Sequence, residues 1–133
     1  MSAIQYHKNA DQIVILTLDS AGQSANTMNA EFRSALDATA QRLKAETGLN
    51  GIIFRSAKKT FFAGGDLDEL IQVQPEQAAG FFSMVQKLKA DLRAVETLGV
   101  PVAAALNGAA LGGGWEVCAQ AGDDCGGARA RAL

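Results

Sequence analysis

The stretch Asn107–Glu116, with the sequence NGAALGGGWE, carries the residue types best suited to chemistry. It follows an apolar run rich in Val and Ala that suits a short buried strand, and it precedes residues without a helix breaker. The glycines therefore lie at a strand-to-helix junction, which leaves backbone N–H groups unpaired at the positive end of the helix dipole. Glu116 follows Gly113 by three residues, so on a helix its carboxylate shares a face with the Gly113 amide. A donor and a base then face one spot, at a natural site for an anion.

The glycines match neither of two common phosphate-binding motifs. A P-loop requires Lys and then Ser or Thr after its last glycine, where this chain has Trp115. The dinucleotide-binding pattern requires a glycine at the position of Val117. The alternative that stays open is a glycine-rich turn in a packed α/β domain.

A second stretch, residues 58–70, also places small residues between a strand segment and a helix signature. Asp66 and Glu69, three residues apart, predict a capping box at the start of that helix. The amides of Ala63, Gly64 and Gly65 are then expected to point outward. The alternative is a short helix that is simply well capped.

Hydrophobic periodicity predicts the elements that position these two stretches. Residues 4–8 and 12–18 form a β-hairpin, a helix begins after the N-cap Asn29 and stops near Gly48, and residues 51–56 form a short buried strand. Apolar residues at helical spacing then mark one face of a long amphipathic helix: Phe81, Val85, Leu88, Leu92 and Val95. Gly99 is expected at the C′ position of that helix, with Pro101 beyond it. A strand over 100–106 and a helix over 115–121 complete an α/β order.

Length and composition limit the chain to a single globular domain. It has 133 residues, of which 48% are hydrophobic and 20% are charged. Lys and Arg total 12 against 14 Asp and Glu, without a long basic run, so we expect neither nucleic acid nor a membrane surface as a partner. The uncharged span from Leu98 to Trp115 contains Pro101, Asn107 and several glycines, and is predicted to be a core segment rather than a membrane helix.

The N-terminus lacks the apolar segment of a secretion signal, so the cytoplasm is the expected location. Cys118 and Cys125 are then expected to be reduced thiols, and their spacing is not that of a metal site. The single histidine, His7, lies in the first predicted strand and is expected at the surface.

Two motifs in order, FAGGDL at 62–67 and NGAALGGGWE at 107–116 with a long helix between them, resemble the crotonase superfamily, the enoyl-CoA hydratase/isomerase family. The loop at 19–29 is similar to that of the hydratase part of multifunctional fatty-acid β-oxidation proteins. The resemblance covers roughly residues 4–121. It implies a crotonase-like spiral of β-β-α units, which agrees with the β, β, α order derived above.

The resemblance also implies a reaction. Family members bind an acyl-CoA and stabilise the enolate of its thioester with two backbone N–H groups, which correspond here to Ala63 and Gly113. Glu116 matches the first of two hydratase glutamates, which hold and deprotonate water for syn addition to a 2-enoyl-CoA. CoA is part of the substrate, so no separate cofactor is implied. A homo-oligomer, a trimer in the family, is the implied assembly.

The CoA moiety is implied to lie along the Ala63 loop and the loop around Asn26. The residues expected to contact it are Ala63, Gly64, Asp66, Asn26 and Gly112. Capping of its helix, which fixes Ala63, is the preferred role of Asp66. Lys58 and Lys59 are candidates for a CoA phosphate, against the alternative of solvated surface lysines.

The chain departs from the family pattern after Glu116, because it contains no later glutamate. Residues 122–133 show no apolar period and a shift to Ala, Gly and Arg, so residues 1–121 are predicted to be the N-terminal part of a crotonase-like domain with an atypical, poorly ordered tail. The alternative function is a truncated, catalytically incompetent fragment that at most binds CoA thioesters. The apolar face Phe81–Val95 is expected to be left partly uncovered.

Overall fold

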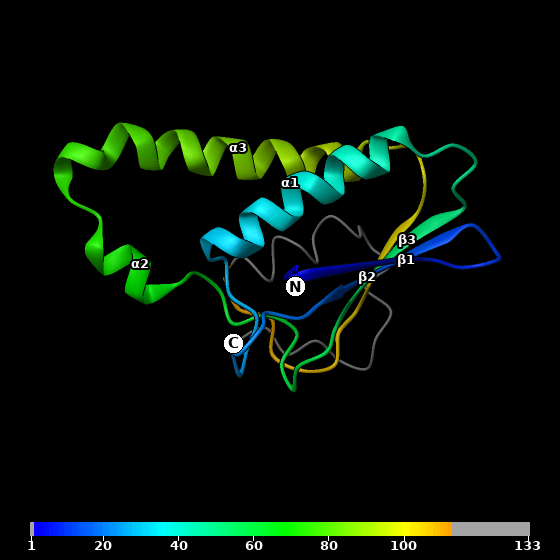
Figure 1. Cartoon of the computed structure of the whole chain (residues 1–133), viewed down its shortest axis with the longest axis horizontal. Helices are drawn as coiled ribbons and strands as arrows, with labels where there is room; N and C mark the ends of the chain where they lie inside the picture. The colour runs from blue at the N-terminus through cyan, green and yellow to red at the C-terminus, as the bar shows by residue number, and fades with distance from the viewer. Residues whose placement is uncertain (1, 113–133) are drawn as a thin grey trace.

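The fold, seen in a computed structural model that describes residues 2–112, is a mixed sheet with helices on one face (Figure 1). Strands β1 and β2 are antiparallel, and β2, β3 and β4 are parallel, in the order β1-β2-β3-β4. The elements are β1 (Ile4–Lys8), β2 (Ile13–Leu18), α1 (Ala30–Ala45), β3 (Gly51–Ser56), α2 (Leu67–Gln72), a 3₁₀ turn η1 (Pro75–Gln77), α3 (Ala78–Glu96) and β4 (Val102–Ala105). The predicted β, β, α, β order is confirmed.

The hairpin between β1 and β2 is closed by Asn9. Its Oδ1 accepts hydrogen bonds from the N–H groups of Asp11 and Ile13, both at 3.0 Å. Gln12 adopts a φ of 61°, which lets the chain reverse within this short connection. The register pairs Tyr6 with Leu16 and thereby directs alternate residues of β2 to the helices.

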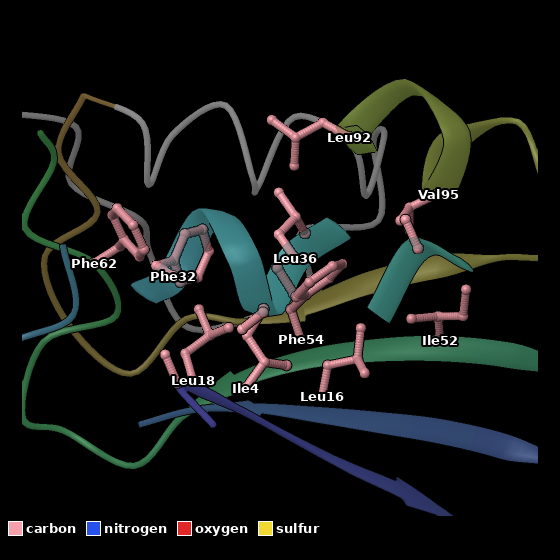
Figure 2. Close-up of a cluster of buried hydrophobic side chains, with 14 of the residues drawn as sticks. Ile4, Leu16, Leu18, Phe32, Leu36, Ile52, Phe54, Phe62, Leu92 and Val95 are labelled. Carbon is pink, nitrogen blue, oxygen red and sulfur yellow. The ribbon is translucent and has the colours of Figure 1, made fainter. Parts of the chain in front are cut away.

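The helix α1 begins as the sequence predicts. Asn29 is its N-cap, and the Asn29 Oδ1 accepts a hydrogen bond from the Phe32 N–H at 2.9 Å. One face of α1 then packs on the sheet, and Figure 2 shows Phe32 and Leu36 beside Leu18 and Phe54. The rings of Phe32 and Phe62 meet edge to face with centroids 5.0 Å apart. This contact ties the core to the loop that follows β3.

The long helix α3 packs against α1 through its C-terminal half only. Leu92 and Val95 are buried, whereas Phe81 and Val85 are half-buried and Phe82 is 64% exposed. Figure 1 shows the N-terminal half of α3 extending past the end of α1, with α2 below it. The predicted uncovered face is therefore confirmed for the first half of α3 and wrong for its second half.

An ionic cluster fixes the crossing of α1 and α3. The Lys87 Nζ lies 2.6 Å from Asp37 Oδ1 on α1 and 2.6 Å from Asp91 Oδ1 on its own helix. Asp91 is buried, so Lys87 supplies the cation that its carboxylate needs in that environment. The same lysine holds the pKa of Asp37 below its usual value, chiefly through the hydrogen bond.

Several boundaries differ from prediction. The last strand spans Val102–Ala105 rather than 100–106, and α3 starts at Ala78, ahead of its first predicted apolar residue. Because the C-cap of α3 is Thr97, Gly99 lies one position beyond C′, where its φ of 82° turns the chain toward β4. The predicted helix at 115–121 and tail at 122–133 lie outside the described residues. Among residues 2–112, no helix is long and apolar enough to span a membrane.

Candidate active site

Three loops at one end of the parallel strands lie side by side. The loop after β3 is the central one, and it is hydrogen-bonded on both sides. On one side Met28 N–H donates to the Gly64 carbonyl at 2.9 Å. On the other, the N–H groups of Phe61 and Phe62 donate to the Ala109 carbonyl at 3.0 and 3.1 Å, and Leu111 N–H donates to the Phe62 carbonyl at 3.0 Å. The two glycine motifs are therefore adjacent, as far as the described residues extend.

The apposition is closest between Gly64 and Gly112. A Cβ on Gly64 would lie 3.3 Å from the Leu111 carbonyl oxygen, and a Cβ on Gly112 would lie 3.5 Å from the Gly64 Cα. Both glycines adopt positive φ, 98° and 51°. A side chain at Gly64 would press on the neighbouring loop, and a side chain at either position would strain the backbone, so glycine suits both places.

A second close contact joins the start of each loop. Asn107 Nδ2 donates to the Lys58 carbonyl at 2.6 Å. A Cβ on Gly108 would lie 2.6 Å from the Lys59 carbonyl oxygen, a distance that real side chains do not tolerate. Asn107 and Gly108, the first residues of the motif at 107–116, thus dock this loop on its neighbour.

Asn26 holds the ends of the strands and the loops together. It is fully buried, and its Oδ1 accepts from the Ser20 N–H at 2.9 Å. Its Nδ2 lies within hydrogen-bond distance of three oxygens, those of Leu18 (3.1 Å), Ser56 Oγ (2.9 Å) and Phe61 (3.3 Å). Since the side chain is buried and already paired, its predicted direct contact with CoA is wrong, and its role is to position the loops.

The amide of Ala63 is also already paired. Its N–H donates to the Asn26 carbonyl at 2.8 Å, which is a full-strength backbone hydrogen bond. This N–H is not available to a substrate oxygen in this arrangement, so the assignment of Ala63 as an oxyanion donor is wrong. The proposed contacts of Ala63, Gly64 and Gly112 with CoA stay predictions.

A second backbone amide of the same loop belongs to Gly65, two positions after Ala63. Gly65 is exposed, whereas Gly64 is buried. Within residues 2–112 no acceptor contacts the Gly65 N–H. A cavity of about 220 Å³ opens next to it. Its walls are mainly apolar, although the charged residues Arg33, Asp66 and Glu69 also line it. The apolar side chains are Met28 from the Asn26 loop, Leu70 from α2, Val73 directly after α2, and Phe81, Met84, Val85 and Leu88 from α3.

Asp66 caps α2 as the sequence predicts. Its Oδ1 accepts from the N–H groups of Asp68 and Glu69 at 3.0 and 3.1 Å. The second half of the predicted capping box is wrong, because the Glu69 carboxylate does not return to Asp66. It accepts instead from the Ala30 N–H at 3.0 Å and from Arg33 Nη1 at 2.9 Å, both on α1.

The lysine candidates for a CoA phosphate have different surroundings. Lys58 Nζ forms an ion pair with Asp19 Oδ1 at 2.8 Å, and both side chains are mostly covered. Lys59 is exposed. Of the two, Lys59 is therefore the one open to a phosphate.

The remaining predicted site residues, Gly113 and Glu116, lie outside the described residues, as do Cys118 and Cys125. The residues that sequence reasoning missed are Gly65, as an exposed residue whose amide is a candidate donor, and the pair formed by Glu69 and Arg33. Gly65 was within the motif, but only the hydrogen bond of Ala63 distinguishes the two amides. The Glu69 partner is 36 residues away in sequence, beyond any local pattern.

Comparison with known proteins agrees with this geometry. Residues 8–123 match the family model described as enoyl-CoA hydratase/isomerase. The chain superposes on an enoyl-CoA hydratase from Bacillus anthracis with a TM-score of 0.75 and 28% identity, over 89% of this chain and 45% of that one. It superposes on an enoyl-CoA hydratase/carnitine racemase from Magnetospirillum magneticum with a TM-score of 0.76 and 26% identity, over 90% of this chain and 44% of that one.

The chain spans less than half the length of these solved structures. Their fold nevertheless covers most of this sequence, so the predicted crotonase-like α/β architecture is confirmed. The family model also matches well over half of the chain and includes both glycine motifs. This chain therefore belongs to the enoyl-CoA hydratase/isomerase family.

Proposed function

We propose that the chain binds an enoyl-CoA thioester and stabilises its enolate with two backbone N–H groups, those of Gly65 and Gly113. The observation that carries the proposal is the direct apposition of the loops at 61–65 and 107–112. Gly113 follows Gly112 directly in sequence, and Gly112 is the residue of this loop that meets Gly64. A donor from each loop can then converge on one thioester oxygen.

The reaction proposed is syn hydration of a 2-enoyl-CoA. Water, deprotonated by the Glu116 carboxylate, forms a C–O bond at Cβ, and the electrons of the double bond move toward the thioester oxygen. The negative charge that develops there is what the two N–H groups stabilise. The proton that Glu116 took from the water then passes to Cα, which completes the addition of water and restores the Glu116 carboxylate. One fixed donor of this kind is typically worth about 3 kcal/mol of barrier.

The cavity beside Gly65 supports an acyl substrate. It has about 220 Å³ of space and apolar walls from Met28, Met84 and Leu88, which suit a hydrocarbon chain. A thioester oxygen held at the Gly65 N–H would direct its acyl chain toward these side chains. A role in fatty-acid β-oxidation, a cytoplasmic location and a homo-oligomeric assembly belong to the same proposal.

Crotonyl-CoA hydration tests the proposal, measured as loss of absorbance by the conjugated thioester. The expected result is turnover that Glu116→Gln abolishes while leaving binding of the thioester, measured by calorimetry, intact. If the unchanged chain binds the thioester without turnover, the result would favour the alternative function, a protein that binds CoA thioesters without catalysing a reaction. Absence of both would contradict the proposal, as would turnover that survives Glu116→Gln.

A further inference from the structure

The short helix α2 is held in place by polar contacts rather than by burial. None of its side chains is buried, and Leu67 and Ile71 are 71% and 79% exposed. A helix of six residues is too short to be stable in isolation. Its position therefore depends on the few contacts that it makes with its surroundings.

Glu69 makes the contacts that fix α2 on α1. Its two carboxylate oxygens accept from the Ala30 N–H at 3.0 Å and from Arg33 Nη1 at 2.9 Å. Ala30 is the first residue of α1, where an N–H has no acceptor within the helix and where a negative charge is favourable. Arg33 Nη1 also donates to the Met28 carbonyl at 2.8 Å. Glu69 thus joins α2 to the start of α1, and Arg33 extends the link to the loop that precedes α1.

The link between Glu69 and Arg33 is strong enough to favour one position of α2 and weak enough to let α2 leave that position. Its hydrogen bonds are charge-assisted, which makes them stronger than neutral ones. The Arg33 and Glu69 side chains are nevertheless 20% and 40% exposed, so water competes for both. The exposed apolar side chains of α2 add little that would prevent it from moving.

The position of α2 decides how much room the cavity offers. Leu70, the residue after Glu69, lines the cavity, and its Cδ1 lies 3.3 Å from where a Cβ on Gly65 would be. Met84 and Val85 of α3 line the same cavity. Figure 1 shows that α2 is joined to α3 by an extended turn and stands apart from the sheet. A shift of α2 would therefore move one wall of the cavity while leaving the sheet and α1 in place.

We infer that Glu69 and Arg33 act as positioning residues, a latch that holds α2 and Leu70 against the cavity beside Gly65 and thereby limits the length of the acyl chain that it accepts. The acyl part of this inference rests on the proposed function, whereas the latch itself does not. When the latch is closed, the cavity has about 220 Å³ and favours a short chain. When it opens, a longer chain can pass between α2 and α3.

Hydrogen exchange of the backbone amides of residues 67–73 tests the latch without any substrate. Glu69→Gln and Arg33→Met are each expected to raise the amide exchange rate of this segment by about fivefold. Each variant removes the same partly exposed ion pair. The double variant should raise it no further, since both changes break the same link. Asp68→Asn is the matched control, because it removes a charge from the same helix turn without a cross-helix contact among the described residues. Equal exchange in the unchanged chain and in Glu69→Gln would overturn the latch.

Binding of butyryl-CoA and decanoyl-CoA, saturated thioesters that cannot be hydrated, tests the effect on chain length. The ratio of the two dissociation constants is expected to shift toward decanoyl-CoA by about tenfold in Glu69→Gln, and to stay unchanged in Asp68→Asn. An equal loss of affinity for both ligands in Glu69→Gln would mean a purely structural role and would overturn the specificity inference. If the unchanged chain binds neither thioester, the proposed function fails, while the exchange measurement still decides the latch.

Discussion

Gly64 and Gly112 meet backbone to backbone, with the Gly64 Cα 3.5 Å from the position that a Cβ on Gly112 would occupy. Their φ angles of 98° and 51° belong to the region that favours glycine. The contact brings together two segments that are 48 positions apart in sequence. It is the physical basis for treating the two glycine motifs as one site.

Gly64→Ala is expected to destabilise the fold by about 2–3 kcal/mol. Positive φ alone costs a non-glycine residue roughly 1–2 kcal/mol, and the new Cβ would also press on the Leu111 carbonyl oxygen. Gly22→Ala is the matched control, because Gly22 has a φ of 69° and no atom near its Cβ position, so only the backbone cost applies. Urea unfolding of the three proteins measures the difference. Equal losses at both positions would show that the two loops do not press against each other.

Asn26→Ala is expected to lower the free energy of unfolding by about 3 kcal/mol or more. It removes the acceptor of the Ser20 N–H and the donor to the Phe61 carbonyl in a buried place, and each group left without a partner costs roughly 1–3 kcal/mol. Asn50→Ala is the control, since the exposed Asn50 side chain makes a single hydrogen bond to the Asp11 carbonyl, and a loss of about 1 kcal/mol at most is expected. A similar, small loss of unfolding free energy for both variants would remove Asn26 from its positioning role.

Tyr6 offers a spectroscopic test of the contact between β1 and the end of α1. It is the only tyrosine, and its pKa is raised to about 12 by burial and by the hydrogen bond to Glu46 Oε1. The phenol is therefore expected to titrate near pH 12 in the folded chain and near pH 10 in denaturant, measured by phenolate absorbance. Because the folded pKa is the higher one, the stabilising effect of Tyr6 is full below pH 10 and is lost as the pH rises toward 12.

Glu46→Gln separates the causes of that shift. Burial is the largest cause, so the pKa of Tyr6 is expected to fall in the variant and yet to stay above 10. Arg42, whose guanidinium carbon lies 3.7 Å from the Tyr6 ring centroid, acts in the opposite direction and is retained. An unchanged titration in Glu46→Gln would exclude the hydrogen bond.

The order of the elements could be predicted from the sequence because the signals are local. Asn29 caps α1, and alternate apolar residues along β2 face the helices, both readable within a few positions. The convergence of the two glycine loops is implied only by the family resemblance, because contacts such as Phe62 with Ala110 join distant parts of the chain. A pattern of spacing within one segment does not contain that information.

Two details of the site could not be predicted for the same physical reason. The sequence does not distinguish the amide of Ala63 from that of Gly65. The difference arises because the Ala63 N–H donates to the Asn26 carbonyl, which is 37 positions away in sequence. The spacing of Asp66 and Glu69 suits a capping box. The Glu69 carboxylate instead accepts hydrogen bonds from Arg33 and from the N-terminal amide of α1. Tertiary partners of opposite charge prevailed over the local hydrogen bond.

The infrared spectrum of bound crotonyl-CoA, labelled with ¹³C at the thioester carbonyl, tests the central claim most directly, because it reports hydrogen bonding to that oxygen without requiring turnover. Gly65→Pro removes the proposed donor, whereas Gly65→Ala keeps it and places a Cβ only against the flexible end of Leu70. The carbonyl stretch is expected to move to lower frequency on binding to the unchanged chain and to Gly65→Ala, and to recover most of that shift in Gly65→Pro. A bound thioester whose stretch does not move in the unchanged chain, or whose full shift survives in Gly65→Pro, would contradict the account.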